Sequence, residues 1–298
     1  MTIIVTGSSG LLGSALVRAL RADGVRVVRM VRRPPRGDDE SFWDPEKGVV
    51  DRAVLEGSEA VVHLAGAGIG DRRWSDAYKR EIVRSRVRGT ETLAGALADL
   101  AGDAPALLSG SAIGFYGDTG DRAVDETAPP GEGFLAREVV VPWEERTAPA
   151  EEAGVRVVRL RTGLVLSGRG GMLVKMLPVF RLGLGAPLGS GRQYWSWISI
   201  DDWVHAVRHI LRNPQMSGPV NLTAPEPVTN AEFTRELGRV LRRPTMPLAV
   251  PGAALRAAMG GFAGEGVLIG QRVLPRRLLD DGHTFRHMRL GDALAAVL

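Results

Sequence analysis

MTIIVTGSSGLLGSALVRAL, the stretch from residue 1 to residue 20, decides which fold we expect. Residues 3–5 are apolar with no polar face, as in a strand that is covered on both sides. Three glycines follow with the spacing G-x-x-G-x-x-G: Gly7, Gly10 and Gly13. Residues 11–20 then repeat apolar side chains at helical spacing. A strand, a glycine-rich turn and a helix start aim free N–H groups at a phosphate, so the stretch predicts a dinucleotide-binding crossover. The alternative is an ordinary tight turn between a strand and a helix.

The composition of the 298 residues is that of an ordinary soluble globular protein, with 44% hydrophobic and 24% charged residues. Cysteine is absent, which excludes disulfides, thiol catalysis and thiolate metal sites. The first strand pattern begins at residue 2, and no apolar run reaches about eighteen residues. We therefore expect a cytoplasmic protein without a membrane segment.

The charge pattern argues against nucleic-acid binding. The net charge is only +4, and the basic residues, almost all arginine, are dispersed among acidic ones without interleaved aromatic residues.

His205 and His209 are four residues apart and could place two ligands on one helix face, but no H-E-x-x-H pattern accompanies them. We expect neither a nucleic-acid partner nor a metal site.

The second strand pattern, at residues 25–31, indicates which nicotinamide cofactor is bound. It ends in Arg32 and Arg33, about 20 residues after the glycine turn, where an acidic residue would bond the ribose 2′-hydroxyl of NAD. Arginine instead accommodates a 2′-phosphate, so this position predicts NADP(H). The alternative is another surface arginine in an arginine-rich chain.

Further along the chain, strand and helix patterns alternate. A buried strand is predicted at residues 60–66, further strands at 106–111, 155–160, where the pattern alternates, and 220–222, helices at 74–97 and 138–153, and a polar connection at 34–47. Beyond residue 225, helices are predicted at 231–241 with Asn230 as N-cap, and near 253–259, 267–273 and 290–297.

These patterns predict an α/β protein in two parts. Residues 1–166 plus 197–224 should form a Rossmann-type, doubly wound parallel sheet that binds NADP(H). Residues 167–196 plus 225–298 should form a smaller, mostly helical substrate lobe, because residues 168–196 break the alternation of strands and helices.

Several motifs resemble those of the extended short-chain dehydrogenase/reductase family. They include T-G-x-x-G-x-x-G at 6–13, H-L-A-G at 63–66, S-G-S-A-I-G-F-Y-G-D at 109–118, M-L-P-V-F-R-L-G-L-G-A-P-L-G-S-G-R-Q at 176–193 and W-I-S-I-D-D at 197–202. The longer motifs resemble one atypical subgroup, usually labelled "epimerase family protein", which ends in a small helical region of unassigned role. The resemblance covers essentially the whole chain and implies an NADP(H)-dependent oxidoreductase or epimerase.

The chain departs from the extended family where proton transfer takes place. The family's Tyr-x-x-x-Lys pair, in which the lysine lowers the tyrosine pKa, has Ala136 and Val140 at the matching positions. Trp195 stands where a diphosphate-clamping arginine is usual, in a loop that also carries Tyr194 and Trp197. Such an aromatic loop suits a flat or apolar substrate, and a packed lid is the alternative.

The resemblance also implies site residues. Ser111 corresponds to the serine that bonds the reacting carbonyl or hydroxyl, and Tyr116 could replace the missing acid if a cation lowered its pKa. Otherwise Tyr116 would pack beneath the cofactor. The residues expected at the cofactor are Gly7, Ser9, Gly10, Leu11, Leu12, Arg32, Arg33, Leu64, Ala65, Gly66, Glu81, Arg86 and Leu164. For Glu81 and Arg86 a solvated helix face is the alternative.

Two functions remain open on the sequence alone. The first is an NADP(H)-dependent oxidoreductase or epimerase that acts on an unidentified small molecule. The second is a non-catalytic NADP(H)-binding module, such as a redox sensor or a structural subunit, which the missing Tyr–Lys pair favours. A homodimer is possible in either case.

Overall fold

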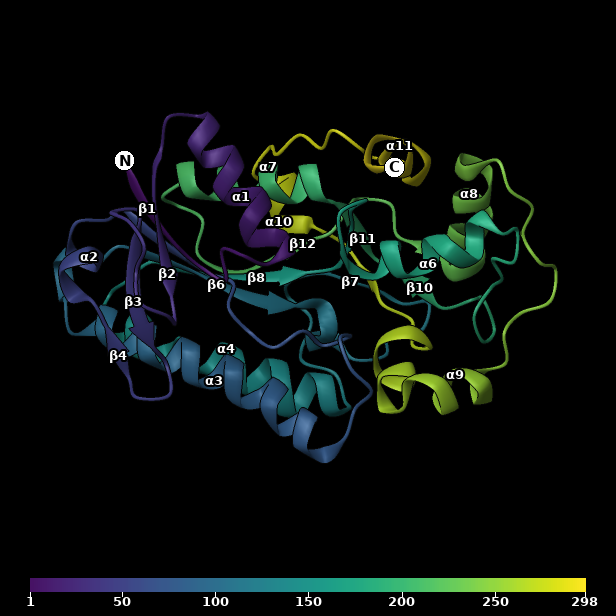
Figure 1. Cartoon of the computed structure of the whole chain (residues 1–298), viewed down its shortest axis with the longest axis horizontal. Coiled ribbons are helices and arrows are strands. Elements are labelled where there is room, and N and C mark those ends of the chain that lie inside the picture. The colour runs from purple at the N-terminus through teal and green to yellow at the C-terminus, as the bar shows by residue number, and fades with distance from the viewer.

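An eight-stranded sheet forms the centre of the computed structural model, which describes all 298 residues apart from the side chain of Ala101 (Figure 1). The strand order is β12-β8-β6-β5-β1-β2-β3-β4. The strands are β1 (Thr2–Thr6), β2 (Arg26–Val31), β3 (Glu40–Asp44), β4 (Val49–Val50), β5 (Ala60–His63), β6 (Ala106–Ala112), β8 (Val157–Thr162) and β12 (Gly218–Leu222). All neighbours are parallel except β3 and β4. The order reverses between β1 and β5, which opens a crevice at their carboxyl ends, and the predicted Rossmann-type fold is confirmed.

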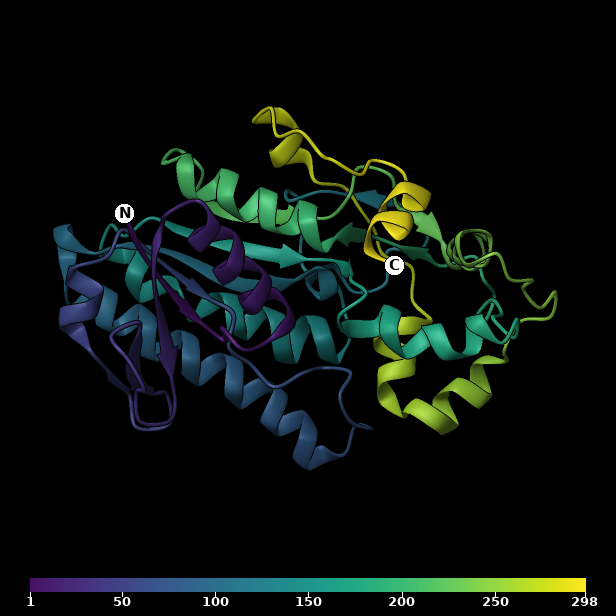
Figure 2. The same ribbon diagram turned by 45° about the horizontal axis from the view of Figure 1, so that its top comes forward.

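Helices cover both faces of the sheet (Figure 2). The elements are α1 (Leu11–Ala22) and α7 (Ile200–Arg212) on one face, and α3 (Asp76–Ala98), α4 (Val141–Glu145) and α5 (Ala148–Glu152) on the other, with α2 (Arg52–Glu56) preceding β5. Ile3 and Val5 belong to the core beneath α1 and α7, whereas Ile4 belongs to the core beneath α3. Both faces of β1 are therefore buried, which explains why residues 3–5 carry no polar side chain.

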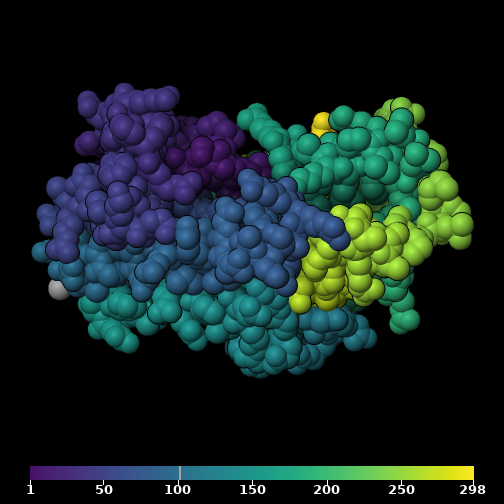
Figure 3. Space-filling model, turned by 60° about the horizontal axis from the view of Figure 1, so that its bottom comes forward, coloured from purple at the N-terminus to yellow at the C-terminus, as the bar shows by residue number. Residues whose placement is uncertain are grey.

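Part of the remaining chain packs around a separate apolar core, which includes Leu173, Phe233 and Leu294. The additional elements are β7 (Ala123–Val124), β9 (Leu164–Leu166), α6 (Gly171–Arg181), β10 (Tyr194–Trp195), β11 (Trp197–Ser199), β13 (Val228–Thr229), α8 (Asn230–Leu241), α9 (Gly252–Met259), β14 (Arg272–Val273), α10 (Arg276–Asp280) and α11 (Leu290–Val297). Figure 3 shows the segment around α9 beside the start of α3. At this contact the rings of Trp74 and Phe262 lie 5.6 Å apart.

Four local predictions differ from the structure. Residues 40–44 form β3 rather than a polar connection, because Trp43 is buried against the sheet. The helix predicted at 138–153 is divided into a π-helical turn (Leu135–Val140), α4 and α5, with a proline in the first turn of α4 and of α5. Thr229, not Asn230, caps α8 through a capping box with Glu232. The helix predicted near 267–273 does not form. A π-helical turn (Ala263–Val267) ends at the first of these residues, and the last two form β14, which pairs with β7.

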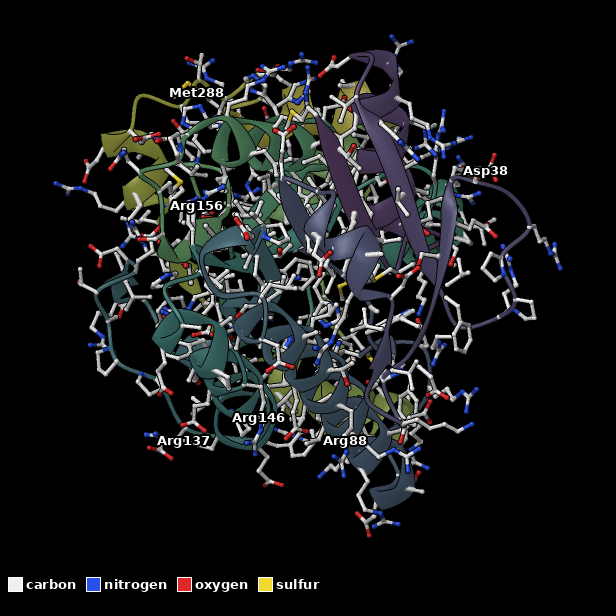
Figure 4. All side chains as sticks on the ribbon, turned by 90° about the vertical axis from the view of Figure 1, so that its left-hand side faces the viewer. Asp38, Arg88, Arg137, Arg146, Arg156 and Met288 are labelled. Atoms are coloured by element: carbon white, nitrogen blue, oxygen red, sulfur yellow. The ribbon has the colours of Figure 1, made fainter. Side chains whose placement is uncertain are left out.

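Charged side chains of both signs are mixed on the outside of the molecule. Arg88, Arg137 and Arg146 point away from the sheet (Figure 4), and the first two pair with Glu91 and Glu132. Within the part of the chain that the structure describes, no helix is both long and apolar enough to span a bilayer.

Candidate cofactor and substrate site

The glycine turn after β1 has the close packing that a dinucleotide site requires. Gly7 has a φ of +63°, and a Cβ atom there would lie 2.7 Å from the carbonyl carbon of Leu64. A Cβ atom on Gly13 would lie 2.3 Å from the oxygen of Gly7, so only glycine lets α1 pack this closely on the turn. These two positions bring the start of α1 against the ends of β1 and β5.

The first turn of α1 is open to an anion. Its N-cap, Gly10, provides no side-chain oxygen to the first backbone N–H groups. A polar hollow of about 950 Å³ touches Ser9, Gly10 and Leu11 at this end of the helix, and Arg169 lines the same hollow. A pyrophosphate would find unpaired N–H groups, the positive end of the helix dipole and a nearby guanidinium here. Sequence patterns did not predict Arg169 at this site, since it lies more than 150 residues beyond the glycine turn.

A buried hydrogen-bond network holds the turn after β5. The Thr6 hydroxyl lies 2.8 Å from His63 Nδ1 and accepts the N–H groups of Leu64 and Ala65 at 3.1 and 3.2 Å. Burial lowers the pKa of His63 to about 4, so the imidazole is neutral. Because Thr6 Oγ1 already accepts two N–H groups, its own proton is directed to His63 Nδ1. The main chain at Leu64 and Ala65, predicted to line the cofactor, is therefore fixed against Gly7.

Arg32 and Arg33 differ in how much of their hydrogen-bonding capacity is free. Arg33 donates two hydrogen bonds to Glu40, at 2.7 and 2.6 Å, and this pairing lowers the Glu40 pKa to about 2. Arg32 is exposed and, among the described residues, makes no ion pair. Of the two, Arg32 is the guanidinium that is free to bind a 2′-phosphate.

Glu81 and Arg86 lie on different faces of α3. Glu81 is exposed and borders a hollow that Arg32 also lines. Arg86 is buried and donates to the carbonyl oxygens of Ala67 and Ile82 at 2.9 and 3.1 Å. It packs against Gly66, where a Cβ atom would lie 3.4 Å from Arg86 Cγ. Arg86 thus holds the main chain of the loop after β5. Of the two residues, only Glu81 lines the hollow that Arg32 also lines.

Ser111 and Tyr116 belong to a buried network behind the site. The Ser111 hydroxyl donates to Glu144 Oε1 at 2.5 Å, and Arg161 holds the same carboxylate with two hydrogen bonds of 2.8 and 2.7 Å. Arg161 also donates to the Tyr116 hydroxyl at 2.9 Å, and that hydroxyl donates to Asn221 Oδ1 at 2.8 Å. All five side chains are buried.

The environment of Tyr116 does not favour proton transfer. Burial raises its pKa to about 12 and outweighs the opposing effect of the Arg161 charge. The condition under which Tyr116 was expected to replace the missing acid, a cation that lowers its pKa, is therefore not met. Tyr116 instead links the ends of β8 and β12.

An apolar pocket of about 670 Å³ lies at the carboxyl ends of β6 and β8. Its wall on the sheet side is formed by Ala112, Ile113, Leu135 and Val140. Successive side chains of a strand point to opposite faces, so Ala112 lines the pocket while Ser111 faces Glu144. Neither Ser111 nor Tyr116 lines this pocket, and the geometry therefore does not support their predicted catalytic roles.

The opposite side of the pocket comes from segments that follow β8 in the chain. Leu164, predicted to lie near the nicotinamide, lines the pocket, as do Tyr194 and Trp195 of the aromatic loop. Trp195 is buried against Phe233, with ring centroids 5.1 Å apart, and Trp197 is fully buried in the core. Tyr194 and Trp195 thus border the pocket, and Trp197 is part of the packed core beneath it.

Comparison with known proteins assigns the family. Residues 3–222 match the NAD dependent epimerase/dehydratase family, and residues 250–297 match a domain of unknown function, DUF1731. The chain belongs to this epimerase family. It is 53% identical to Epimerase family protein Mb2239 of Mycobacterium bovis, over 98% of this chain and 96% of that protein. It is 40% identical to the chloroplastic SDR39U1 homolog of Arabidopsis thaliana, over 100% of this chain and 87% of that protein.

Solved structures agree with this assignment. The human epimerase family protein SDR39U1 (isoform 2), crystallised with NADPH, is 33% identical with a TM-score of 0.90, over 100% of this chain and 99% of that chain. The UDP-glucose 4-epimerase of Thermus thermophilus, in complex with NAD, is 18% identical with a TM-score of 0.74 and supports the fold alone. The predicted extended short-chain dehydrogenase/reductase membership is confirmed, and a close structural relative binds NADPH.

The residues that the sequence analysis missed come from distant parts of the chain. Glu144, Arg161 and Asn221 form one network although 77 positions separate the first from the last (221 − 144). A buried-strand pattern that contains an arginine, as at 157–162, signals that Arg161 needs an internal partner. No spacing rule identifies Glu144 as that partner.

Proposed function

We propose that this chain is an NADP(H)-dependent oxidoreductase whose substrate occupies the apolar pocket at the ends of β6 and β8. The observation that carries the proposal is the free guanidinium of Arg32, directly after β2, which pairs in parallel with β1, the strand that leads into the open first turn of α1. The NADPH of the human relative is consistent with this arrangement. We further propose a cytoplasmic location, in keeping with the absence of cysteine from the chain.

When bound, NADP(H) supplies or accepts a hydride. The residues of this chain hold and orient it: the first turn of α1 binds the pyrophosphate, and Arg32 binds the 2′-phosphate. Leu64 and Ala65 are held by the Thr6–His63 network. No acid replaces the Tyr–Lys pair on the apolar wall among the described residues, so proton exchange with the substrate is left to solvent, which reaches the pocket on the side where Val179 and Leu184 are exposed.

The experiment compares the dissociation constants of NADPH and NADH by fluorescence titration. Arg32→Ala should reduce the preference for NADPH by about 10-fold or more, because a charged hydrogen bond contributes about 1.5–3 kcal/mol. Arg33→Ala is the matched control and should leave the preference unchanged, since Arg33 is already paired with Glu40. An unchanged ratio in Arg32→Ala would contradict the proposal.

The second candidate is a non-catalytic NADP(H) sensor, which the apolar wall at Ala112 and Val140 favours. A panel of carbonyl compounds, followed by NADPH absorbance, separates the two. Tight NADPH binding without oxidation by any carbonyl would support the sensor.

A further inference from the structure

We infer that the small molecule in this pocket is a neutral and largely apolar carbonyl compound without a phosphate group. The inference rests on the proposed function, since it names the substrate class of the same site. It differs from the sugar nucleotides named for the distant solved relatives.

The chemistry of the walls and the volume of the pocket carry the inference. Aliphatic side chains come from four separate segments: Ile113 after β6, Leu135 in the π-helical turn, Met172, Met176 and Val179 in α6, and Leu255 and Met259 in α9. Unbranched methionine side chains adapt to the outline of a bound apolar molecule. A pocket of about 670 Å³ lies within the range of small-molecule sites.

Two apolar side chains of the pocket remain uncovered. Val179 is 48% exposed and Leu184 is 55% exposed, although both line the hollow. Removing such surface from water is favourable, so an apolar ligand seated here gains affinity that a hydrated sugar would not.

The charges around the pocket argue against a diphosphate. Lys175 is the one basic residue among the described residues of the lining, and it already donates to the oxygen of Gly70 at 2.6 Å. Its ammonium also lies 4.0 Å from Asp71, another lining residue, so the two charges cancel. A diphosphate would lose its hydration here without gaining a bidentate partner.

The polar side chains deeper in the pocket are mostly engaged with the protein. Thr162 Oγ1 donates to the oxygen of Leu160 and accepts from Trp203 Nε1, both at 3.1 Å. Ser196 Oγ donates to the oxygen of Gln271 at 2.7 Å and accepts the N–H of Val273 at 2.8 Å. The Gln271 amide nitrogen donates to the oxygens of Ile113 and Gly117. A ligand with many hydroxyl groups would find few free partners, which favours a molecule with a single polar group.

The test uses three probes on the full chain saturated with NADP⁺. They are 2-acetylnaphthalene as a neutral flat ketone, 2-naphthoate as an anion of similar size, and UDP-glucose. Binding is measured by isothermal titration calorimetry and by quenching of tryptophan fluorescence, to which Trp195 in the pocket wall contributes. We expect the ketone to bind at least 10-fold more tightly than naphthoate, and UDP-glucose to show no binding.

A charged substitution locates the binding. Val179→Glu places a carboxylate in the pocket at a half-exposed position and should weaken ketone binding about 10-fold. Met246→Glu is the matched control, because Met246 is 42% exposed and does not line the pocket, and it should leave binding unchanged. Thermal melting checks that both variants are folded.

The outcomes separate this inference from the proposed function. UDP-glucose binding as tight as that of the ketone, or ketone binding that Val179→Glu leaves unchanged, would overturn the inference. A titration of the same protein with NADPH tests the cofactor site independently. If NADPH binds and the ketone does not, the inference fails while the proposed cofactor site stands. If the ketone binds in the pocket and NADPH does not, the proposed function fails instead.

Discussion

Glu144 and Arg161 form an ion pair in the interior, with side chains that are 8% and 5% exposed. Arg161 meets both carboxylate oxygens, and Ser111 and Tyr116 complete the hydrogen bonds of the pair. A buried pair costs much desolvation free energy, and losing one partner leaves the other charge uncompensated. The network therefore fixes α4 against the ends of β6 and β8. The apolar wall of the pocket lies directly beside this network, at the end of β6 and in the π-helical turn that precedes α4.

Glu144→Gln should lower the free energy of unfolding by about 3–5 kcal/mol, because it leaves the buried Arg161 guanidinium without a counter-charge. Urea denaturation followed by circular dichroism measures this loss. The matched control is Glu132→Gln, which breaks the exposed pair with Arg137 and should change the stability little. Equal losses in the two variants would show that the buried pair has no special role.

His63 makes the stability depend on pH. Its pKa is about 4 in the folded chain, against an ordinary value of about 6.5 in the unfolded chain. Between these values the unfolded state binds the additional proton, so the folded state is destabilised as the pH falls. The contribution is fully present above pH 6.5 and is lost progressively down to pH 4. For His63 alone, the drop from pH 7 to pH 5 should be about 2 kcal/mol.

Urea unfolding of the wild type and of His63→Gln at pH 7 and pH 5 measures this contribution. The variant cannot bind the proton, so its stability should fall less between the two pH values, by about the amount assigned to His63. Buried His283, whose pKa is also lowered to about 4, should keep part of the pH dependence in the variant. A pH dependence identical to that of the wild type would rule out His63 as its source.

At the scale of elements, local patterns predicted those pieces that local interactions determine. The β1–turn–α1 unit, the long helix α3 and the final helix α11 all follow from apolar periodicity and glycine spacing. Strand β3 was not predicted because three of the five residues of its sequence, ESFWD, are polar and give it no apolar pattern. Its strand conformation depends on pairing with β2 and on the burial of Trp43, which are tertiary contacts. Helices α4 and α5 each have a proline in their first turn, Pro142 and Pro149. The sequence pattern alone did not show where these prolines would begin and end the helices.

The candidate site was predictable where backbone determines it and less so where side chains do. Gly7, Gly10 and Gly13 lie at the crossover as predicted from their spacing. Ser111 was expected at the pocket from its motif, but which strand residue faces the pocket depends on where β6 ends. The structure brings Ala112 to the wall and Ser111 to Glu144. The same limit applies to Arg33. The sequence offered Arg32 and Arg33 as ligands of the 2′-phosphate, and only the tertiary contact shows that Arg33 is already paired with Glu40.

At the scale of the whole molecule, the cofactor crevice and the apolar pocket meet at one edge of the sheet. Gly170 and Gly171 lie against Leu11, so a Cβ atom on either would be within 3.4 Å of its side chain. The loop between β9 and α6 thus joins the start of α1 to the helix that carries Met172 and Met176. The family's architecture is retained here, and Ala136 and Val140 stand at the positions where the sequence comparison with the extended family led us to look for the Tyr–Lys pair.

The central claim is that a phosphorylated nicotinamide nucleotide binds at the first crossover and faces a wall that carries no proton donor. A crystal structure of this chain with NADPH tests it most directly. We predict the pyrophosphate at the first turn of α1, the 2′-phosphate at Arg32, and the nicotinamide next to Ala112 and Val140. A nucleotide bound elsewhere, or a tyrosine–lysine pair from another segment beside the nicotinamide, would contradict the claim.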